Sequence, residues 1–407
     1  MIKRRWIASL VLLIGLGTAA AAASGNSRRP RAAVASACAN DYSAHRVPGN
    51  PLDLPAAPGS DPLHGASFFV DGPAHGAPAG AIAQLVGINT ASFGDNVSWA
   101  TFKSDVARAL RSHPGVAGKV HLLEKIAAEP EPQKFSAFSG GGDPTAIATQ
   151  VRKILCYNLA ADPGTVPIVD TYFLHATLKG CPTSSEIYAY MPRFKAQINA
   201  MVNATGDQAI VYLIEEDGIG SSACIAKHGA LGAWEAALRY EVDEVATLPH
   251  AVAYLEAGYS DAQSPSYTAK VLNAAGVRRI RGFWTNDTHL NWTINEINWG
   301  EQISKLTHGA HFVVNTAQNG NGPLRNPHPA SQGVEDLCNP PGRALGPRPN
   351  TSTGFKQVDA FLWSTVPGNS AGCGGGPPGG VFYPARAEAL AARANGRLGP
   401  HYPSKPY

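Results

Sequence analysis

Three consecutive carboxylates, Glu215, Glu216 and Asp217, directly follow an apolar run in the stretch VYLIEEDGIG (211–220). Negative charges this close disfavour one another's ionisation, so one carboxyl of such a group keeps a raised pKa. A protonated carboxyl can donate to the leaving oxygen of a glycosidic bond while a second carboxylate assists the attacking water. The cluster is therefore a candidate for acid–base catalysis; the alternative is that Asp217 only caps a helix N-terminus.

Short apolar runs indicate the β-strands that would position such groups: 133–138, 165–174, 208–215, 250–257, 279–285, 310–316 and 358–363. Between them lie stretches with apolar residues at helical spacing, at 144–159, 186–202, 234–248 and 266–277. Alternating strands and helices, with near-continuous apolar strands, predict an α/β fold whose parallel sheet is covered by helices. The number of strands favours a barrel or near-barrel over an open sheet.

Polar residues gather where these predicted strands end. Four consecutive runs end in Glu-Glu-Asp, Glu-Ala-Gly, Trp-Thr-Asn-Asp (284–287) and Asn-Thr-Ala-Gln-Asn-Gly (315–320). Because β/α barrels carry their catalytic groups at the carboxyl ends of the strands, we expect these residues to line a site. Aromatic side chains near strand ends could stack on sugars, with ordinary packing as the alternative for each: Tyr172, Tyr259, Trp284, Trp292 and Trp299.

The first residues have the pattern of an export signal. Lys3, Arg4 and Arg5 precede the apolar segment WIASLVLLIGLG and small residues suited to cleavage near Ala23, so we expect residues 1–24 to be a signal peptide. Residues 25–60 lack periodicity and are predicted to be a linker or irregular arm, and residues 61–400 a single globular domain. The mature chain is therefore expected to be secreted, with no membrane association after cleavage.

Composition and motifs limit the partners. The formal net charge is +3 over 407 residues, and no basic run interleaves with aromatics, so we expect no nucleic-acid partner. Six cysteines in an exported chain indicate disulfides, whose pairing is open at this point. The histidines show no metal-site spacing and the glycine-rich stretches no phosphate loop, so no metal and no organic cofactor is expected. We expect a monomer.

Several stretches resemble motifs of glycoside hydrolase family 6, the cellobiohydrolases and endoglucanases that cut β-1,4-glucan with inversion. IEED (214–217) resembles I/L-E-P-D, whose Asp is the general acid, and YLEAGYSD (254–261) resembles Y-L-D-A-G-H-S. DLCNPPGRALGPRP (336–349) closely matches W-C-N-P-P-G-R-x-L-G. Four further stretches continue the resemblance in the same order: PLHGASFFVD (62–71, more loosely), GFWTNDT (282–288), FVVNTAQNGNGP (312–323) and VDAFLWSTVPGNSAG (358–372).

The resemblance implies a distorted seven-stranded parallel β/α barrel of TIM-like type, which agrees with the strand count. It implies the disulfides Cys181–Cys224 and Cys338–Cys373, which leaves Cys38–Cys156 as a third pair. It assigns Asp217 as the general acid, and we expect Tyr172, Trp284 and Asn286 to line the sugar cleft.

The same stretches depart from the family at several functional positions. The family's second-strand loop reads Y-x-x-P-x-R-D-C, and Gly180 stands here in place of its Asp, with Lys179 in place of the Arg. Ala371 stands in place of the Asp proposed as base in the last loop. Other replacements affect sugar-binding or neighbouring positions: Tyr259, Asn315, Gln318, Leu337, Thr365 and Asn369.

A replacement base or auxiliary carboxylate could come from Asp170, Glu256, Asp261 or Asp287, all near predicted strand ends. Glu256 matches an acidic family position, and Asp170 lies two residues before Tyr172, on the same side of its strand. We therefore expect a glycoside hydrolase that acts on a β-1,4-glucan or related polysaccharide with inversion. The alternatives are a catalytically impaired glycan-binding protein on the same barrel, and a hydrolase for another linkage.

Overall fold

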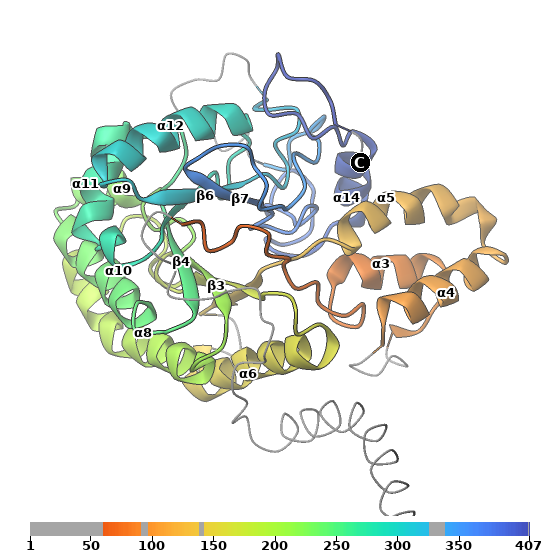
Figure 1. Ribbon diagram of the computed structural model, residues 1–407, viewed down its shortest axis with the longest axis horizontal. Coiled ribbons are helices and arrows are strands. Elements are labelled where there is room, and N and C mark those ends of the chain that lie inside the picture. Colours follow the sequence, from red (N-terminus) through yellow and green to blue (C-terminus); the bar gives the residue numbers. More distant parts are fainter. Residues whose placement is uncertain (1–59, 91–96, 138–141, 325–337, 406) are drawn as a thin grey trace, which may run out of the picture. The chain divides into compact units, whose positions relative to one another are not determined.

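Seven parallel strands, hydrogen-bonded to one another in chain order from β1 to β7, form the sheet at the centre of the protein (Figure 1). The computed structural model describes residues 60–90, 97–137, 142–324, 338–405 and 407. The strands are β1 (Gln133–Ser136), β2 (Ile168–Tyr172), β3 (Ile210–Ile214), β4 (Ala251–Glu256), β5 (Gly282–Thr285), β6 (His311–Asn315) and β7 (Val358–Leu362). The sheet curls as a distorted β/α barrel, and each strand falls inside one of the seven predicted runs.

The register of the sheet places the strand ends beside one another. Lys134 pairs with Asp170, and Ser136 pairs with Tyr172, so the ends of β1 and β2 are level. Every residue of β3 and of β7 is buried, as expected for parallel strands that are covered on both faces. The loops that follow the carboxyl ends therefore form one surface of the sheet.

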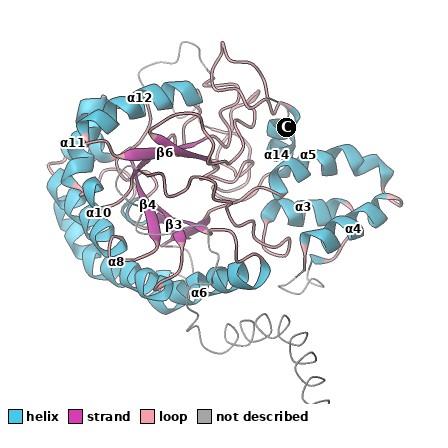
Figure 2. Cartoon of the chain, in the orientation of Figure 1, coloured by secondary structure: helices cyan, strands magenta, loops and turns pink. Residues whose placement is uncertain are grey.

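Helices cover the outside of the sheet (Figures 1 and 2). Helices α6, α8, α10, α11 and α12 follow one another around it, and successive members such as α6 and α8 pack together. The α-helices are α3 (Ala77–Leu85), α4 (Trp99–Leu110), α5 (Ala117–Ala127), α6 (Pro144–Ala161), α7 (Leu174–Leu178), α8 (Ser184–Thr205), α9 (Ser222–Lys227), α10 (Leu231–Val245), α11 (Pro265–Ala274), α12 (Thr293–Leu306) and α14 (Pro384–Ala392). Two short 3₁₀ helices are η2 (Pro114–Val116) and η4 (Val277–Arg279).

Local sequence signals start several of these helices. The Thr183 hydroxyl accepts a hydrogen bond from the N–H of Glu186, and the Glu186 carboxylate accepts one from the N–H of Thr183, which is a capping box at the start of α8. Asp143 and Ser264 cap α6 and α11 in front of a proline at the first helical position. These signals fix where the polypeptide leaves each loop and enters the outer layer.

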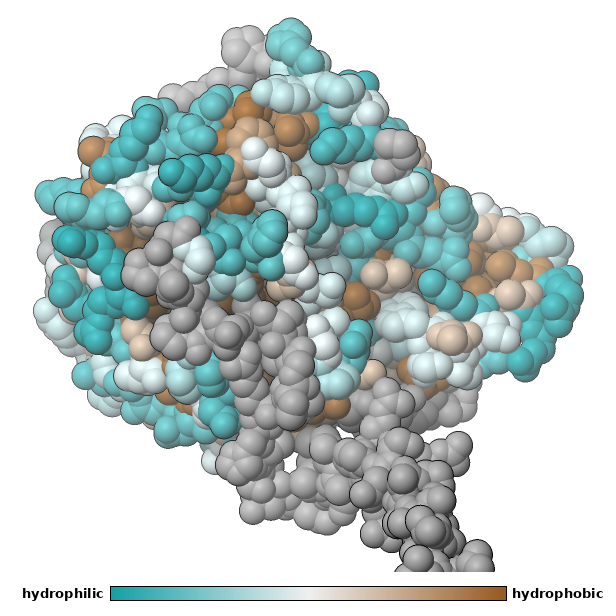
Figure 3. Space-filling model, viewed as in Figure 1, coloured by the Kyte–Doolittle hydropathy of each residue, from teal (hydrophilic) through white to brown (hydrophobic). Residues whose placement is uncertain are grey.

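Among the described residues, many of the buried apolar side chains belong to one of two large clusters. One fills the interior of the sheet, with Leu213, Tyr254, Trp284 and Leu362 among its members. The other joins α3, α4 and α5 to α14, with Trp363 at its edge. Outside the grey segments, the face in Figure 3 is mostly hydrophilic, with apolar residues in small groups.

The predicted signal peptide (1–24) and nearly all of the predicted arm (25–60) fall outside the described residues. The described residues belong to one compact unit. Within the described residues, no helix combines the length and apolarity that crossing a membrane requires.

Candidate active site

The loop after β3 brings the three consecutive carboxylates to the carboxyl end of the sheet in an unusual backbone conformation. Glu215 and Asp217 have positive φ angles of 48° and 61°, a region that non-glycine residues adopt only when the surroundings enforce it. Here β2 enforces it: Thr171 accepts hydrogen bonds from the N–H of Glu215 at its Oγ1 (2.8 Å) and from the N–H of Glu216 at its carbonyl oxygen (2.9 Å). The positions of the three side chains are therefore set by the neighbouring strand.

Glu215 is the structural member of the three. Its side chain is fully buried, and its two carboxylate oxygens accept hydrogen bonds from the N–H groups of Phe173 and Leu174, each at 2.9 Å. Those N–H groups lead into α7, whose first turn has no partner for them within the helix. Glu215 thus fixes the loop after β2 against the loop after β3.

Asp217 is half-buried and faces a tyrosine hydroxyl. The Tyr172 hydroxyl lies 3.4 Å from Oδ2 of Asp217, and the N–H of Asp217 donates to Oδ2 of Asp287 at 2.8 Å. Burial, together with the negative charge of Glu216, raises the pKa of Asp217 to about 7, while Lys134 and the hydrogen bond from Tyr172 work in the opposite direction. A carboxyl with this pKa is partly protonated near neutral pH, as a general acid must be.

Lys134 on β1 connects acidic groups of β2 and of the loop after β3. Its Nζ pairs with Glu216 and lies 3.4 Å from Oδ2 of Asp170, which is fully buried. Nζ also lies 5.5 Å from the ring centre of Tyr172, within the range of a cation–π contact. Burial raises the pKa of Asp170, which Lys134 opposes, and the pKa of Lys134 is itself raised by Glu216 and Asp170 against the effect of burial. The lysine thus partly neutralises the acids around Asp217.

The two auxiliary candidates, Asp170 and Glu256, lie near the cluster and are both fully buried. Asp170 faces Lys134 and has no exposed surface. Glu256 accepts hydrogen bonds at Oε2 from the N–H groups of Ile219 (2.6 Å) and Gly220 (3.0 Å), and at Oε1 from that of Gly258. Its carboxylate therefore holds the loop that follows Asp217.

Two predicted sugar-contacting residues are corrected by the structure. Trp284 is fully buried in the interior cluster, and its indole N–H points to the carbonyl of Ile214 at 3.3 Å, so it offers no face to a ligand. Asn286 is 1% exposed and uses its amide to join Asn291 and Asn315. Both were placed correctly near a strand end, but their side chains point into the fold. Tyr172, the third predicted contact, is half-buried beside Asp217.

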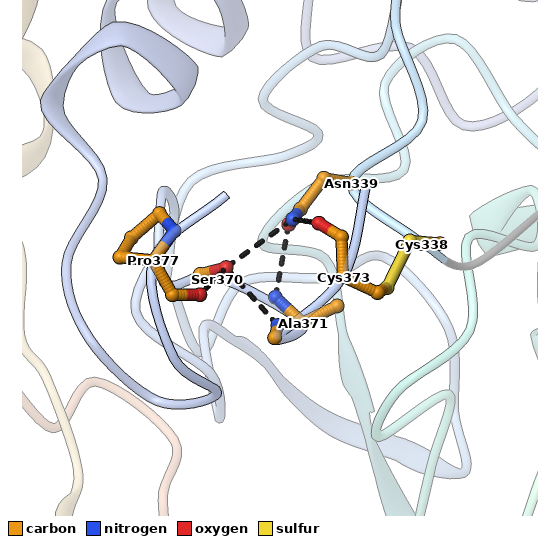
Figure 4. Close-up of a disulfide and its surroundings, with 7 residues drawn as sticks. Cys338, Asn339, Ser370, Ala371, Cys373 and Pro377 are labelled. Carbon is orange, nitrogen blue, oxygen red and sulfur yellow. Dashed lines mark hydrogen bonds between the residues drawn. A yellow bond between two sulfur atoms is a disulfide. The ribbon is translucent and has the colours of Figure 1, made fainter. Parts of the chain in front are cut away.

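Both disulfides implied by the resemblance are present. Cys181 and Cys224 join the loop after β2 to α9, with 5.5 Å between their Cα atoms. Cys338 and Cys373 join two loops near β7, with 5.6 Å between their Cα atoms (Figure 4). Cys156 is also disulfide-bonded, and its predicted partner Cys38 lies outside the described residues.

The two positions that lack the family's aspartates are exposed. Ala371 lies beside the second disulfide, where its N–H donates to Oδ1 of Asn339 at 2.9 Å while the Asn339 amide group donates to the carbonyl of Cys373 at 2.8 Å (Figure 4). Gly180, with a φ of +73°, has no atom within 4 Å of the position that a Cβ would occupy. Neither residue carries a group that can transfer a proton.

Other polar residues of this region were not identified as site residues from the sequence. Lys134 reaches Glu216 only through the pairing of β1 with β2, which no local motif reveals. His175, whose ring stacks on Tyr172, lies 2.8 Å through Nδ1 from the Ser221 hydroxyl. His289 lies 3.0 Å through Nδ1 from Oδ1 of Asp261. Among the described residues, no group of three or more His, Cys, Asp or Glu side chains is arranged to hold a metal ion.

Comparisons with known proteins agree with the sequence motifs. The family model described as "Glycosyl hydrolases family 6" matches residues 178–394. Endoglucanase 1 of Streptomyces sp. (strain KSM-9) is 30% identical over 287 residues, which cover 69% of this chain and 74% of the relative. Endoglucanase A of Cellulomonas fimi is 29% identical over 67% of this chain, and the match spans only 56% of that relative's length.

Solved structures show the same architecture. The endoglucanase Cel6 of Mycobacterium tuberculosis, solved in complex with methyl-cellobiosyl-4-deoxy-4-thio-β-D-cellobioside, has a TM-score of 0.66 and 27% identity. The similarity covers 82% of this chain and 99% of that structure. Endoglucanase CEL6B of Humicola insolens has a TM-score of 0.61 at 18% identity, and this likeness concerns the fold alone.

Proposed function

The chain belongs to the glycosyl hydrolases of family 6, and from this premise we propose that it is a secreted glycoside hydrolase that cleaves a β-1,4-glucan or related polysaccharide with inversion. Asp217 is proposed as the general acid that protonates the leaving oxygen. A water molecule attacks the anomeric carbon from the opposite face, which inverts its configuration.

The observation that carries the proposal is the environment of Asp217. Its pKa is raised to about 7, chiefly by burial and by the charge of Glu216, so the carboxyl is partly protonated near neutral pH. The Tyr172 hydroxyl next to its Oδ2 orients the carboxyl. A solvated helix-cap aspartate would have neither property, which argues against the helix-cap interpretation of this residue.

The relatives support a glucan substrate. Two similar chains are named endoglucanases, and the structure of the Mycobacterium tuberculosis enzyme contains a thio-linked cello-oligosaccharide. Of Tyr172, Trp284 and Asn286, which were expected to line the sugar cleft, only Tyr172 keeps partly exposed surface. We therefore retain Tyr172 as a sugar contact and no longer assign that role to Trp284 and Asn286.

The substitutions at Gly180 and Ala371 favour the second candidate, a barrel that binds glycans without cleaving them. An Asp217 without neighbouring carboxylates would support that candidate. Instead, the charge of Glu216 raises the pKa of Asp217, and Asp287 accepts the N–H of Asp217. The pKa of Glu256 is raised chiefly by burial and also by the charges of Asp287 and Asp217. A dense acidic cluster is costly in a protein that only binds neutral sugars, so we favour the enzyme.

Export by the N-terminal signal and a monomeric state remain part of the proposal. They rest on the pattern of residues 1–24 and on the absence of any sequence signal for a partner chain. The proposed chemistry requires no metal or organic cofactor, because proton transfer and water attack are sufficient.

The decisive experiment is the release of reducing sugar from a panel of soluble and insoluble glucans. We expect activity on at least one β-1,4-glucan and a loss of about 10²–10⁴-fold in Asp217→Asn, the range typical of a general acid. Asp243→Asn is the matched control, because Asp243 pairs with Arg279 on the outer surface, away from the sheet ends. Binding without hydrolysis in the native chain would establish the second candidate, and unchanged activity in Asp217→Asn would exclude Asp217 as the acid.

A further inference from the structure

Asp261 and His289 form a buried pair at the carboxyl ends of β4 and β5. Nδ1 of His289 lies 3.0 Å from Oδ1 and 3.2 Å from Oδ2 of Asp261. The Asn291 amide donates to Oδ1 of Asp261 at 2.6 Å and to Oε1 of Glu296 at 2.9 Å. The carboxylate of Asp261 is therefore held in a fixed orientation towards the imidazole.

These contacts determine which imidazole nitrogen is available. Burial alone would raise the pKa of Asp261, but the hydrogen bonds from His289 and Asn291 and the histidine charge lower it below its usual range. An ionised Asp261 accepts hydrogen bonds only, so the proton of neutral His289 resides on Nδ1 and the lone pair on Nε2. Nε2 makes no hydrogen bond within the part of the chain that the structure describes. The pair thus presents an unused basic nitrogen, oriented by a carboxylate as in Ser-His-Asp enzymes.

Asp287 and Tyr259 link His289 to the proposed acid. His289 lies two residues after Asp287, which accepts the N–H of Asp217, and a charged His289 would lower the pKa of Asp287. The His289 ring stacks on Tyr259, with 3.3 Å between ring centres and 12° between planes. The pKa of the Tyr259 hydroxyl is raised chiefly by burial and also by the charges of Asp287 and Asp217, so the Tyr259 ring lies near both acids.

The remaining acidic residues are less suited to accept a proton from water. The carboxylate of Glu256 is filled by three N–H groups. Asp287 accepts the N–H of Asp217 at one oxygen and the N–H of Thr288, at 2.5 Å, at the other. Asp170 is buried against Lys134. The imidazole of His289 combines an Nε2 without a hydrogen bond among the described residues and a carboxylate, that of Asp261, which orients the ring through Nδ1.

We propose that His289, oriented by Asp261, is the catalytic base that accepts the proton of the attacking water, in place of the carboxylates absent at Gly180 and Ala371. This rests on the proposed function. As the water oxygen bonds to the anomeric carbon, its proton moves to Nε2 of His289. The glycosidic C–O bond breaks and its oxygen takes the proton of Asp217. The products are a reducing end of inverted configuration and a free hydroxyl, and solvent returns the proton from His289 to Asp217.

His289→Ala tests the base directly. We expect kcat to fall about 10²–10⁴-fold with little change in KM, because general-base assistance acts on the transition state. A substrate with an activated aryl leaving group, which relieves the need for an acid, should restore Asp217→Asn but leave His289→Ala impaired. Sodium azide, a nucleophile with no proton to lose, should restore His289→Ala and give the α-glycosyl azide. A kcat near that of the native chain, or a loss that azide does not relieve, would overturn the proposal.

Asp261→Asn provides a second test that does not depend on His289→Ala folding. Without the carboxylate charge the imidazolium is less stable, so the acid limb of the kcat/KM profile should move to lower pH. The other titratable groups around the pair are Asp287, Glu296 and Tyr259, and all three are unchanged in this variant. An unmoved acid limb would show that Asp261 and His289 are only structural. If the native chain itself hydrolyses no glucan, the proposed function is wrong. That result differs from a failure of the base assignment, in which the native chain is active but the variants do not behave as expected.

Discussion

Lys134 on the first strand forms an ion pair with Glu216, the residue that directly precedes the proposed acid. The side chain of Lys134 is 37% exposed, whereas that of Glu216 is 9% exposed, so the lysine brings a solvated charge to a nearly buried acid. Because Lys134 also faces Asp170, one cation balances carboxylates from two strands. The ionisation of Asp217 therefore depends on residues that do not themselves transfer a proton.

The first prediction concerns the pH profile of the native chain. A general acid acts in its protonated form, and the pKa of Asp217 is raised to about 7, so kcat/KM should fall as pH rises through about 7. The measurement is hydrolysis of the best glucan from pH 4 to 9. A profile that stays flat to pH 9 would contradict the assignment.

Single substitutions of Lys134 and of Glu216 should move the alkaline limb of this profile, which is the fall of kcat/KM at high pH, in opposite directions. The charge of Lys134 lowers the pKa of Asp217, so Lys134→Met should move the limb to higher pH. The charge of Glu216 raises the same pKa, so Glu216→Gln should move it to lower pH. Lys134→Arg keeps the charge and serves as the control. Shifts of the same sign in Lys134→Met and Glu216→Gln would show that charge is not the cause.

Replacement of the proposed acid should stabilise the fold above neutral pH. A carboxyl whose folded pKa is raised contributes stability that is present below its unfolded pKa and lost as pH rises through the folded value. At pH 8 the native fold must therefore bury an ionised Asp217, which costs free energy. Asp217→Asn has no charge to bury, so its free energy of unfolding at pH 8 should exceed that of the native chain by about 1–2 kcal/mol. Urea unfolding at pH 5 and pH 8 measures the effect, and equal values at pH 8 would refute it.

Glu215→Gln should destabilise the protein without removing an acid from the reaction. A glutamine can accept only one of the N–H bonds from Phe173 and Leu174, and its own N–H₂ faces the other, which costs about 1–3 kcal/mol. Glu186→Gln, in the exposed capping box of α8, should cost less, because the glutamine oxygen can still accept the N–H of Thr183. Urea unfolding compares the two variants, and a smaller loss in Glu215→Gln would contradict the structural role.

The two described disulfides should differ in their effect on activity but not on stability. Their cysteines are 43 and 35 residues apart, so removing either by paired Cys→Ser changes should cost a similar free energy of unfolding, about 2–4 kcal/mol. Cys181–Cys224 connects the loop after β2 to the helix after Asp217, and we expect kcat to fall further without it than without Cys338–Cys373. Equal residual kcat values would show that neither bridge positions the acid.

The sheet could be predicted from sequence because parallel strands are buried on both faces and are therefore apolar throughout. The run at 165–174 is longer than β2 (Ile168–Tyr172), since its last residues start α7, a short helix that has no clear periodic pattern. Helices α3, α4 and α5 were not predicted; α3 and α5 carry only a weak division into polar and apolar sides, and their burial depends on packing with α14.

The site was only partly predictable. A strand end identifies residues near the carboxyl edge, and Asp217 and Tyr172 do lie together there, while their roles stay predictions. It does not say which way a side chain points, and Trp284 and Asn286 point into the fold. The partnership of Lys134 with Glu216, and that of Asp261 with His289, join residues 82 and 28 positions apart, and only the folded chain brings them together.

Gly180 and Ala371 are both exposed, among the described residues no atom lies within 4 Å of the position of a Cβ at Gly180, and Ala371 is held through its backbone N–H by Asn339. A glycine or alanine codon that ends in a pyrimidine becomes an aspartate codon by one nucleotide change. Asp also tolerates the left-handed backbone better than most residues, so position 180 could accept it. From such a codon an aspartate at either position is one nucleotide change away, so a laboratory selection for glucan hydrolysis would have a short route to both acids.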